Sequence, residues 1–153
     1  MDAAVGELLR EAAIRRERGQ FAEAARAYAA VLSARPNLPD AWYNLAYSQR
    51  MIGAYDQALT SYDEALARGA PHPEEILVNK AVIYSDFLRD DVNAERALRT
   101  ALSLAPDSVP ALLNLGNLHE DRGEREAARS CYERILECDG ENARALARLA
   151  NAL

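Results

Sequence analysis

Apolar residues recur along the chain at spacings of three, four and seven residues, which is the period of one face of an α-helix. Short polar stretches that contain glycine or proline separate the apolar segments, as expected where helices end. The pattern predicts helices near residues 3–18, 21–34, 39–52, 55–68, 74–87, 91–104, 109–122, 125–138 and 142–152. The sequence therefore predicts an all-α chain.

The helical segments repeat with a period of 34 to 36 residues. The first helix of each pair carries a small residue in one column: Ala12, Ala46, Ala81 and Gly116. The second helix carries an alanine column and a mostly aromatic column: Ala24, Ala58, Ala94 and Ala128, then Tyr28, Tyr62, Leu98 and Tyr132. Gly19, Gly53 and Gly123 supply a left-handed backbone position between the two helices. Some column spacings are longer than 34 residues, and one extra residue near 71–73 and another near 89–91 account for the difference.

The runs Trp42–Ala46 (WYNLA) and Gly53–Ala58 (GAYDQA), together with Pro106 and the 34-residue period, resemble the tetratricopeptide repeat family. The resemblance covers the whole chain and implies a right-handed α-solenoid, a superhelix of stacked antiparallel helix pairs. It implies a single array over residues 1–153, with repeats at about 5–38, 39–73, 74–108 and 109–142 and an extra packing helix at 143–153.

Some positions depart from the family pattern. Leu88 and Arg89 stand where the third turn should have its glycine, so a longer turn is expected there. Gly140 replaces the fourth closing proline. Glu11 and Arg15 occupy columns that are usually apolar, which is typical of a polar cap at the end of an array.

Composition and charge narrow the function. Alanine accounts for 31 of the 153 residues, which favours close helix packing, and the alanine columns mark where the helices touch. The net charge of −6 disfavours nucleic acid as a partner, because phosphate binding needs a basic surface. Apolar runs are too short to span a membrane, and charged residues interrupt the amino-terminal segment where a signal peptide would be apolar.

The two cysteines favour a reducing compartment. Cys131 and Cys138 are seven residues apart on one predicted helix, which separates their Cα atoms by about 10 Å. A disulfide needs a Cα separation below about 7 Å. We therefore expect buried or half-buried thiols and a cytoplasmic location.

The family resemblance places the first helix of each repeat on a concave groove, which is expected to receive a peptide. One groove column holds polar residues: Arg10, Asn44, Asn79, Asn114 and Arg148. Asparagine both donates and accepts, so this column could bond the backbone of an extended peptide. It is similar to the asparagine ladder in the repeat superhelix of O-linked N-acetylglucosamine transferases. The alternative is that these asparagines bond a neighbouring helix.

Other groove columns add apolar and charged groups. Tyr43, Tyr47 and Met51 predict an apolar anchor pocket, with packing against the adjacent repeat as the alternative. The remaining predicted groove residues are polar: Arg16, Arg50, Asp86, Asn117, Glu120 and Asp121. The two arginines lie towards the amino end of the groove and the carboxylates towards the other end. A partner with an acidic and a basic part would match this gradient, although such charges can also be simple solvated faces.

Several sharper functions find no support in the residues. Leu9 stands where repeats that clamp chaperone tails have their first lysine, and Lys80 falls in a packing column, which disfavours that role. His119 lacks a second histidine at metal-binding spacing and is expected to be a partly buried structural residue. No nucleophile–base arrangement or phosphate loop is present, so we expect no catalysis, no cofactor and no metal.

The sequence thus predicts a protein–protein interaction module or scaffold whose partner is a protein or peptide. An alternative is the recognition domain at the amino end of a larger bacterial enzyme. The run Asn79–Asp90 resembles bacterial tetratricopeptide arrays that precede sulfotransferase domains, but no sulfotransferase residues are present. A further alternative is a self-assembling scaffold, because Leu146, Leu149 and Leu153 give the last helix an apolar strip that could drive self-association.

Overall fold

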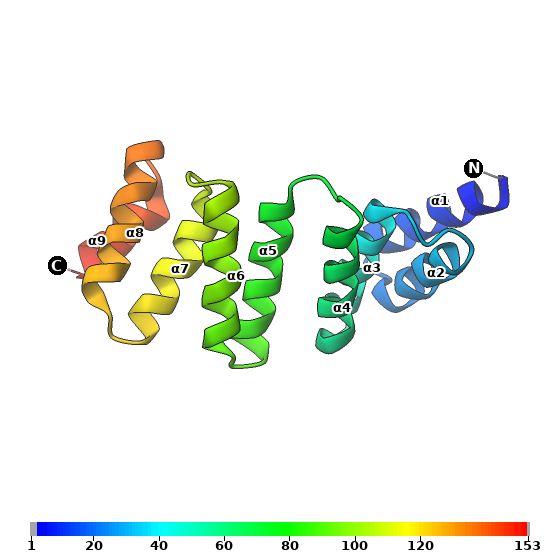
Figure 1. Cartoon of the computed structure of the whole chain (residues 1–153), viewed down its shortest axis with the longest axis horizontal. Helices are drawn as coiled ribbons and strands as arrows, with labels where there is room; N and C mark the ends of the chain where they lie inside the picture. Colours follow the sequence, from blue (N-terminus) through cyan, green and yellow to red (C-terminus); the bar gives the residue numbers. More distant parts are fainter. Residues whose placement is uncertain (1–2, 153) are drawn as a thin grey trace. The chain divides into compact units, whose positions relative to one another are not determined.

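The computed structural model describes residues 3–152, and every regular element in that range is a helix (Figure 1). The predicted helix boundaries agree with the observed ones to within one residue at most ends, and the all-α class is confirmed. The chain forms two compact units, Met1–His72 (unit 1) and Pro73–Leu153 (unit 2). The division falls at the predicted end of the second repeat. Leu153, which belongs to the predicted apolar strip, lies outside the described residues.

Unit 1 contains two antiparallel helix pairs. Its helices are α1 (Ala3–Glu17), α2 (Phe21–Ala34), α3 (Pro39–Met51) and α4 (Tyr55–Ala67). Helix α1 packs against α2, α3 packs against α4, and α2 contacts α3. Alanine permits these close approaches, since one buried cluster consists of Ala12, Ala24, Ala25, Tyr28, Leu32, Ala41 and Leu45. Gly19 and Gly53 occupy the left-handed region, with φ of 75° and 81°, as the turn pattern predicts.

Unit 2 contains the other two pairs and a last helix. Its α-helices are α5 (Pro73–Val82), α6 (Asp91–Leu104), α7 (Val109–Asp121), α8 (Arg125–Cys138) and α9 (Ala143–Ala152). Helix α9 packs against α8, where Ala145 is fully buried and Leu149 packs at the edge of the same cluster. The outward side chain Leu146 remains 48% exposed. The predicted packing role of the last helix therefore agrees with its contacts.

The first helix of the third repeat does not end as predicted. Its last residues, Ile83–Phe87, form a π-helical turn, η1, in which the Leu88 N–H donates to the Ile83 carbonyl at 3.1 Å. Arg89 then takes the left-handed position with φ of 55°, where the other repeats use glycine. Asp90 caps α6 by accepting from the Asn93 N–H at 3.1 Å. The wide turn accommodates the extra residue that the spacing of the columns requires.

The column of small residues allows close helix packing, as Gly116 shows most directly. A Cβ atom added at Gly116 would lie 2.5 Å from Cε1 of Tyr132, far inside van der Waals contact. The tyrosine ring therefore occupies the space that an alanine methyl group would need. This contact explains why the fourth repeat has glycine where the others have alanine.

The two cysteines differ in exposure. Both are free thiols, and Cys131 is buried between helices whereas Cys138 is exposed at the end of α8. The expectation of a buried or half-buried thiol is thus correct for Cys131 and wrong for Cys138. Among the described helices, none has both the length and the apolar character needed to cross a membrane.

Candidate functional site

A cleft of about 330 Å³ opens on unit 1. Five side chains line it: Arg16 near the end of α1, Phe21 at the start of α2, and Tyr43, Asn44 and Tyr47 on α3. Tyr43 and Tyr47 are one helical turn apart and therefore project from the same face of α3. Four of these five residues belong to the groove predicted from the sequence. We call this site the unit 1 cleft.

The polar side of the unit 1 cleft is fixed by hydrogen bonds. Arg16 donates from Nη1 to Oδ1 of Asn44, and Asn44 donates from Nδ2 to the Asp40 carbonyl at 3.0 Å. One of the two lone pairs of Asn44 Oδ1 is therefore occupied, and one hydrogen of its NH2 group remains. Arg16 forms no ion pair within the described residues and keeps several N–H donors. The polar groups of the cleft are thus donors that would attract an acceptor.

The aromatic side of the cleft is formed by rings that also pack against neighbours. Phe21 and Tyr47 meet edge to face with ring centroids 5.8 Å apart, and Tyr43 meets Tyr62 of α4 in the same way at 5.9 Å. Both cleft tyrosines are half-buried. Tyr47 thus packs against a ring of the adjacent repeat, whereas Tyr43 packs against a ring of its own repeat, and both also line the cleft.

Tyr62 lies behind the Tyr43 wall and is fully buried. Burial raises the pKa of its phenol to about 12, the nearby Tyr43 adds to this rise, and the positive charge of Arg50 opposes it. Its hydroxyl has no hydrogen-bond partner among the described residues. The phenol is therefore neutral near pH 7 and has an unsatisfied O–H donor.

Three other residues of the predicted groove in unit 1 do not line the cleft. Arg10 is exposed on α1, and Met51, at the end of α3, is 47% exposed. Arg50 is half-buried and lies close enough to Tyr62 to influence its pKa. The predicted pocket of Tyr43, Tyr47 and Met51 thus has Phe21 as its third apolar wall in place of the methionine.

Two of the three asparagines predicted for unit 2 form hydrogen bonds inside that unit. Asn114 donates to the Pro110 carbonyl at 2.8 Å, just as Asn44 does one turn back on its own helix. Asn117 accepts from the Tyr132 hydroxyl at 3.1 Å, and Asn79 is half-buried on α5.

The charged residues predicted for unit 2 lie at or near the surface. Asp86 is exposed and accepts from the Ser85 hydroxyl at 3.0 Å, and Asp121 is exposed at the end of α7. Glu120 and Arg148 approach each other to 3.8 Å. Asp86, Glu120 and Arg148 thus each have a polar partner inside unit 2.

A second hollow, of about 320 Å³, lies between α7 and α9 in unit 2. It contains two predicted residues, Asn117 and Arg148, and four others: Leu113, Arg144, Ala147 and Asn151. Residues 144, 147, 148 and 151 follow the spacing of one helical face. The sequence of the last helix contains that spacing, next to the apolar strip predicted for it.

Phe21 was not predicted as part of the site. It stands directly after the first turn, in the column that Tyr55 occupies in the second repeat. An aromatic residue at the start of a second helix was therefore a signal in the sequence. Its role depends on the Tyr47 ring that it contacts, and only the folded helix pair brings the two rings together.

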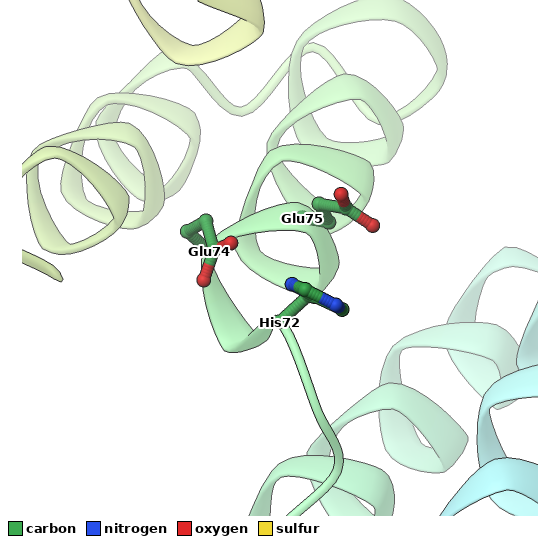
Figure 2. Close-up of side chains that lie close together, drawn as sticks. All are labelled: His72, Glu74 and Glu75. Atoms are coloured by element: carbon green, nitrogen blue, oxygen red, sulfur yellow. The ribbon is translucent and has the colours of Figure 1, made fainter. Parts of the chain in front are cut away.

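The two histidines of the chain, His72 and His119, lie in different surroundings. His119 is buried, and its Nδ1 lies 3.1 Å from Oε1 of Glu124, which agrees with the structural role predicted for it. Figure 2 shows His72 beside the first turn of α5, with one ligand atom each from His72, Glu74 and Glu75 within 4.8 Å of one another. The amino-terminal end of a helix attracts carboxylates and opposes a cation. Helix polarity thus explains the two glutamates, and we assign no metal to them.

Comparison with known proteins identifies the repeat. Two family models, both described as tetratricopeptide repeat, match residues 9–73 and 92–153. No curated protein matches the chain. A tetratricopeptide repeat protein from Parabacteroides merdae is similar at 25% identity and a TM-score of 0.89, covering 99% of this chain and 59% of that one. The chain thus spans about three fifths of that protein.

Two further solved structures share the fold. The MamA protein is 23% identical, with a TM-score of 0.85, over 99% of this chain and 82% of its own. YrrB, described as a TPR protein with an unusual peptide-binding site, is 17% identical, with a TM-score of 0.72, over 95% of this chain and 82% of its own. These likenesses confirm an all-α solenoid fold built from helix pairs.

Proposed function

Because the chain belongs to the tetratricopeptide repeat family, we propose that it is a protein-interaction module that binds a peptide segment of a partner in the unit 1 cleft. The observation that carries the proposal is the Arg16–Asn44 pair beside three aromatic rings. Such a cleft offers apolar area for a side chain and fixed donors for an acceptor, which is the usual composition of a specific binding pocket.

The state of the Asn44 amide defines how the segment would be bound. An asparagine that pairs with both the N–H and the C=O of a peptide uses its own oxygen as the acceptor. Here Arg16 already donates to that oxygen, and most of the hydrogen-bonding capacity left on the two side chains is N–H donors. The segment is therefore expected to present a carbonyl or carboxylate oxygen to Arg16 and Asn44, and an apolar side chain to Phe21 and Tyr47.

The related fold of YrrB supports peptide binding as the general role, since that protein is described as having a peptide-binding site. The sign of the charge in the cleft supports the choice of ligand. Arg16 faces a neutral amide and no carboxylate within the described residues, so an acidic or carbonyl-rich segment would supply the missing partner.

The proposal is tested with a library of random dodecapeptides displayed on phage and selected on the full chain. Peptides that are enriched are synthesised, and their affinities are measured by isothermal titration calorimetry. We expect Asn44→Ala to weaken binding at least tenfold while helicity and the melting temperature stay nearly constant, because Asn44 is half-buried on the surface of α3.

Asn114→Ala is the matched control, because Asn114 makes the same bond to its own helix but lies in unit 2. Binding to this variant should equal that of the wild type. An equal loss in both variants would contradict the unit 1 cleft and favour the asparagine column predicted from the sequence. A collapse of the melting transition in Asn44→Ala would show that this asparagine is structural.

A further inference from the structure

The hydroxyl of Tyr62 is the one buried side-chain polar atom that has no hydrogen-bond partner among the described residues. Tyr62 lies on α4 and is fully buried. Leaving a buried donor unsatisfied reduces the stability of a folded protein, and most such groups in native structures have a partner. The exception therefore calls for an explanation in terms of what the hydroxyl does.

The fourth repeat shows how the same position is satisfied elsewhere. Tyr132 occupies the column of Tyr62, and its hydroxyl donates to Oδ1 of Asn117 at 3.1 Å. In the second repeat, the column of Asn117 holds Tyr47. The ring of Tyr47 packs against Phe21 and lines the unit 1 cleft. The acceptor that satisfies Tyr132 has thus been replaced by a residue of the cleft.

The Tyr62 hydroxyl makes no hydrogen bond to an acceptor among the described residues, and the charged group nearest in effect, Arg50, is a donor. Arg50 is close enough to influence the phenol, yet a guanidinium only donates, so it cannot accept the Tyr62 hydrogen. The Tyr43 ring, 5.9 Å away, separates Tyr62 from the cleft. An O–H and a cationic N–H donor beside each other fit one kind of group, an anionic oxygen.

We propose that Tyr62 is a specificity-determining residue of the unit 1 cleft, whose hydroxyl, together with Arg50, binds a side-chain carboxylate of the bound segment when the Tyr43 ring turns aside. This inference rests on the proposed function of the cleft. It assigns the partner an aspartate or glutamate that reaches behind Tyr43, in addition to the oxygen that meets Arg16 and Asn44.

The first test needs no ligand and compares thermal unfolding of the full-length Tyr62→Phe and Tyr132→Phe variants. Tyr62→Phe removes an unsatisfied hydroxyl, so its melting temperature should equal or exceed that of the wild type. Tyr132→Phe removes a hydroxyl that has a partner and should melt lower. Equal losses in the two variants would show that Tyr62 already has a partner and would overturn the inference.

The second test uses the peptides selected from the phage library. Tyr62→Phe should weaken the binding of those peptides about tenfold, whereas Tyr28→Phe, in the same column of the first repeat, should not. Replacing the glutamate or aspartate of a selected peptide by its amide should weaken binding to the wild type and have little further effect on Tyr62→Phe.

Unchanged affinity in Tyr62→Phe would overturn the inference and leave the proposed function standing. Selected peptides without acidic residues would also overturn it. A library that yields no binder on the wild-type chain would refute the proposed function itself, and with it this inference.

Discussion

Tyr62 in unit 1 and Tyr132 in unit 2 occupy the same column of the repeat, and both rings are fully buried. The Tyr132 hydroxyl donates to Asn117, whereas the Tyr62 hydroxyl has no partner among the described residues. The small residue of the first helix also differs, since Ala46 in unit 1 occupies the column of Gly116, which lies against the Tyr132 ring in unit 2. Identical column residues thus have different energetics, because their neighbours in adjacent columns decide which bonds and contacts they make.

The connections in the two units differ as well. In unit 1, Gly53 provides the left-handed turn residue, and Arg68 forms an isolated ion pair with Glu64 at 3.1 Å. In unit 2, Glu95 pairs with two arginines, Arg99 at 2.8 Å and Arg122, which ties α6 to the turn after α7. Unit 2 therefore adds a small network of charges beside the turn in which Gly123 supplies the left-handed position, with φ of 77°.

The largest expected effect follows from Gly116→Ala. The added methyl group would lie 2.5 Å from Cε1 of Tyr132, so helix packing must shift, and we expect a loss of about 1–3 kcal/mol in the free energy of unfolding. Denaturation in urea measures this loss. Gly6→Ala is the control, because its nearest neighbour atom is 3.9 Å away; this variant should be neutral or more stable. Equal changes in the two variants would contradict the contact with Tyr132.

A second variant transfers the arrangement of unit 2 into unit 1. Tyr47→Asn places an acceptor where Asn117 stands in the fourth repeat, so the Tyr62 hydroxyl gains a partner. A double-mutant cycle of Tyr47→Asn with Tyr62→Phe should show a coupling energy of about 1 kcal/mol. Tyr47→Asn also removes the contact between Tyr47 and Phe21. The same loss occurs whether residue 62 is tyrosine or phenylalanine, so the cycle cancels it. A coupling energy of zero would mean that an asparagine at position 47 does not accept a hydrogen bond from the Tyr62 hydroxyl.

The charge network predicts a dependence on pH. Hydrogen bonds from Arg99 and then Arg122 lower the pKa of the Glu95 carboxyl below its ordinary 4.5, so the ionised form is favoured in the folded state. The stability that this ion pair contributes is fully present at pH values above the ordinary pKa of 4.5. It is lost as the pH falls through the lowered pKa of the folded state. At pH 7, Glu95→Gln should cost about 0.5–1 kcal/mol, and the gap to the wild type should close in acid.

Glu64→Gln is the matched variant in unit 1, where one half-buried arginine, Arg68, is the partner. Its effect at pH 7 should be smaller than that of Glu95→Gln. If the two variants lose the same stability, the second arginine adds nothing to the network. Urea denaturation at a series of pH values provides both comparisons.

The smallest expected effect concerns the turn after η1. Arg89 holds φ of 55°, a conformation that costs little for glycine and more for other residues. Arg89→Gly should therefore raise the free energy of unfolding by about 0.5 kcal/mol, because relief of strain is partly offset by the greater flexibility of the unfolded chain. Gly53→Ala should act in the opposite direction. A loss of stability in Arg89→Gly would indicate that the arginine side chain contributes to the turn.

Most of the fold was predictable because its causes are local or periodic. The apolar period gave the helix boundaries, and the columns of Ala46 and Tyr62 gave the repeat. The π-helical turn at Ile83–Phe87 was not predictable in form, although the inserted residue and the missing glycine marked its place. How a chain absorbs one extra residue depends on backbone hydrogen bonds, which here shift the acceptor of the Leu88 N–H to Ile83.

Four residues of the unit 1 cleft were predicted from the sequence, but the hydrogen bonds that they make were not. Tyr43, Asn44, Tyr47 and Arg16 were expected in the groove and do share one cleft. The occupied oxygen of Asn44 was not visible in the sequence, because it depends on the side-chain conformation of Arg16. The missing partner of Tyr62 likewise depends on three-dimensional distances that the repeat columns do not contain.

The bond between Arg16 and Asn44 also affects the entropy of binding. A free asparagine or arginine side chain loses rotational freedom when a ligand fixes it, at about 0.5–1.5 kcal/mol per immobilised side chain. In the unit 1 cleft, Arg16 and the Asp40 carbonyl restrict the Asn44 rotamer before any segment arrives. A peptide therefore meets an amide whose orientation is already set, and most of the conformational ordering on association falls on the peptide itself.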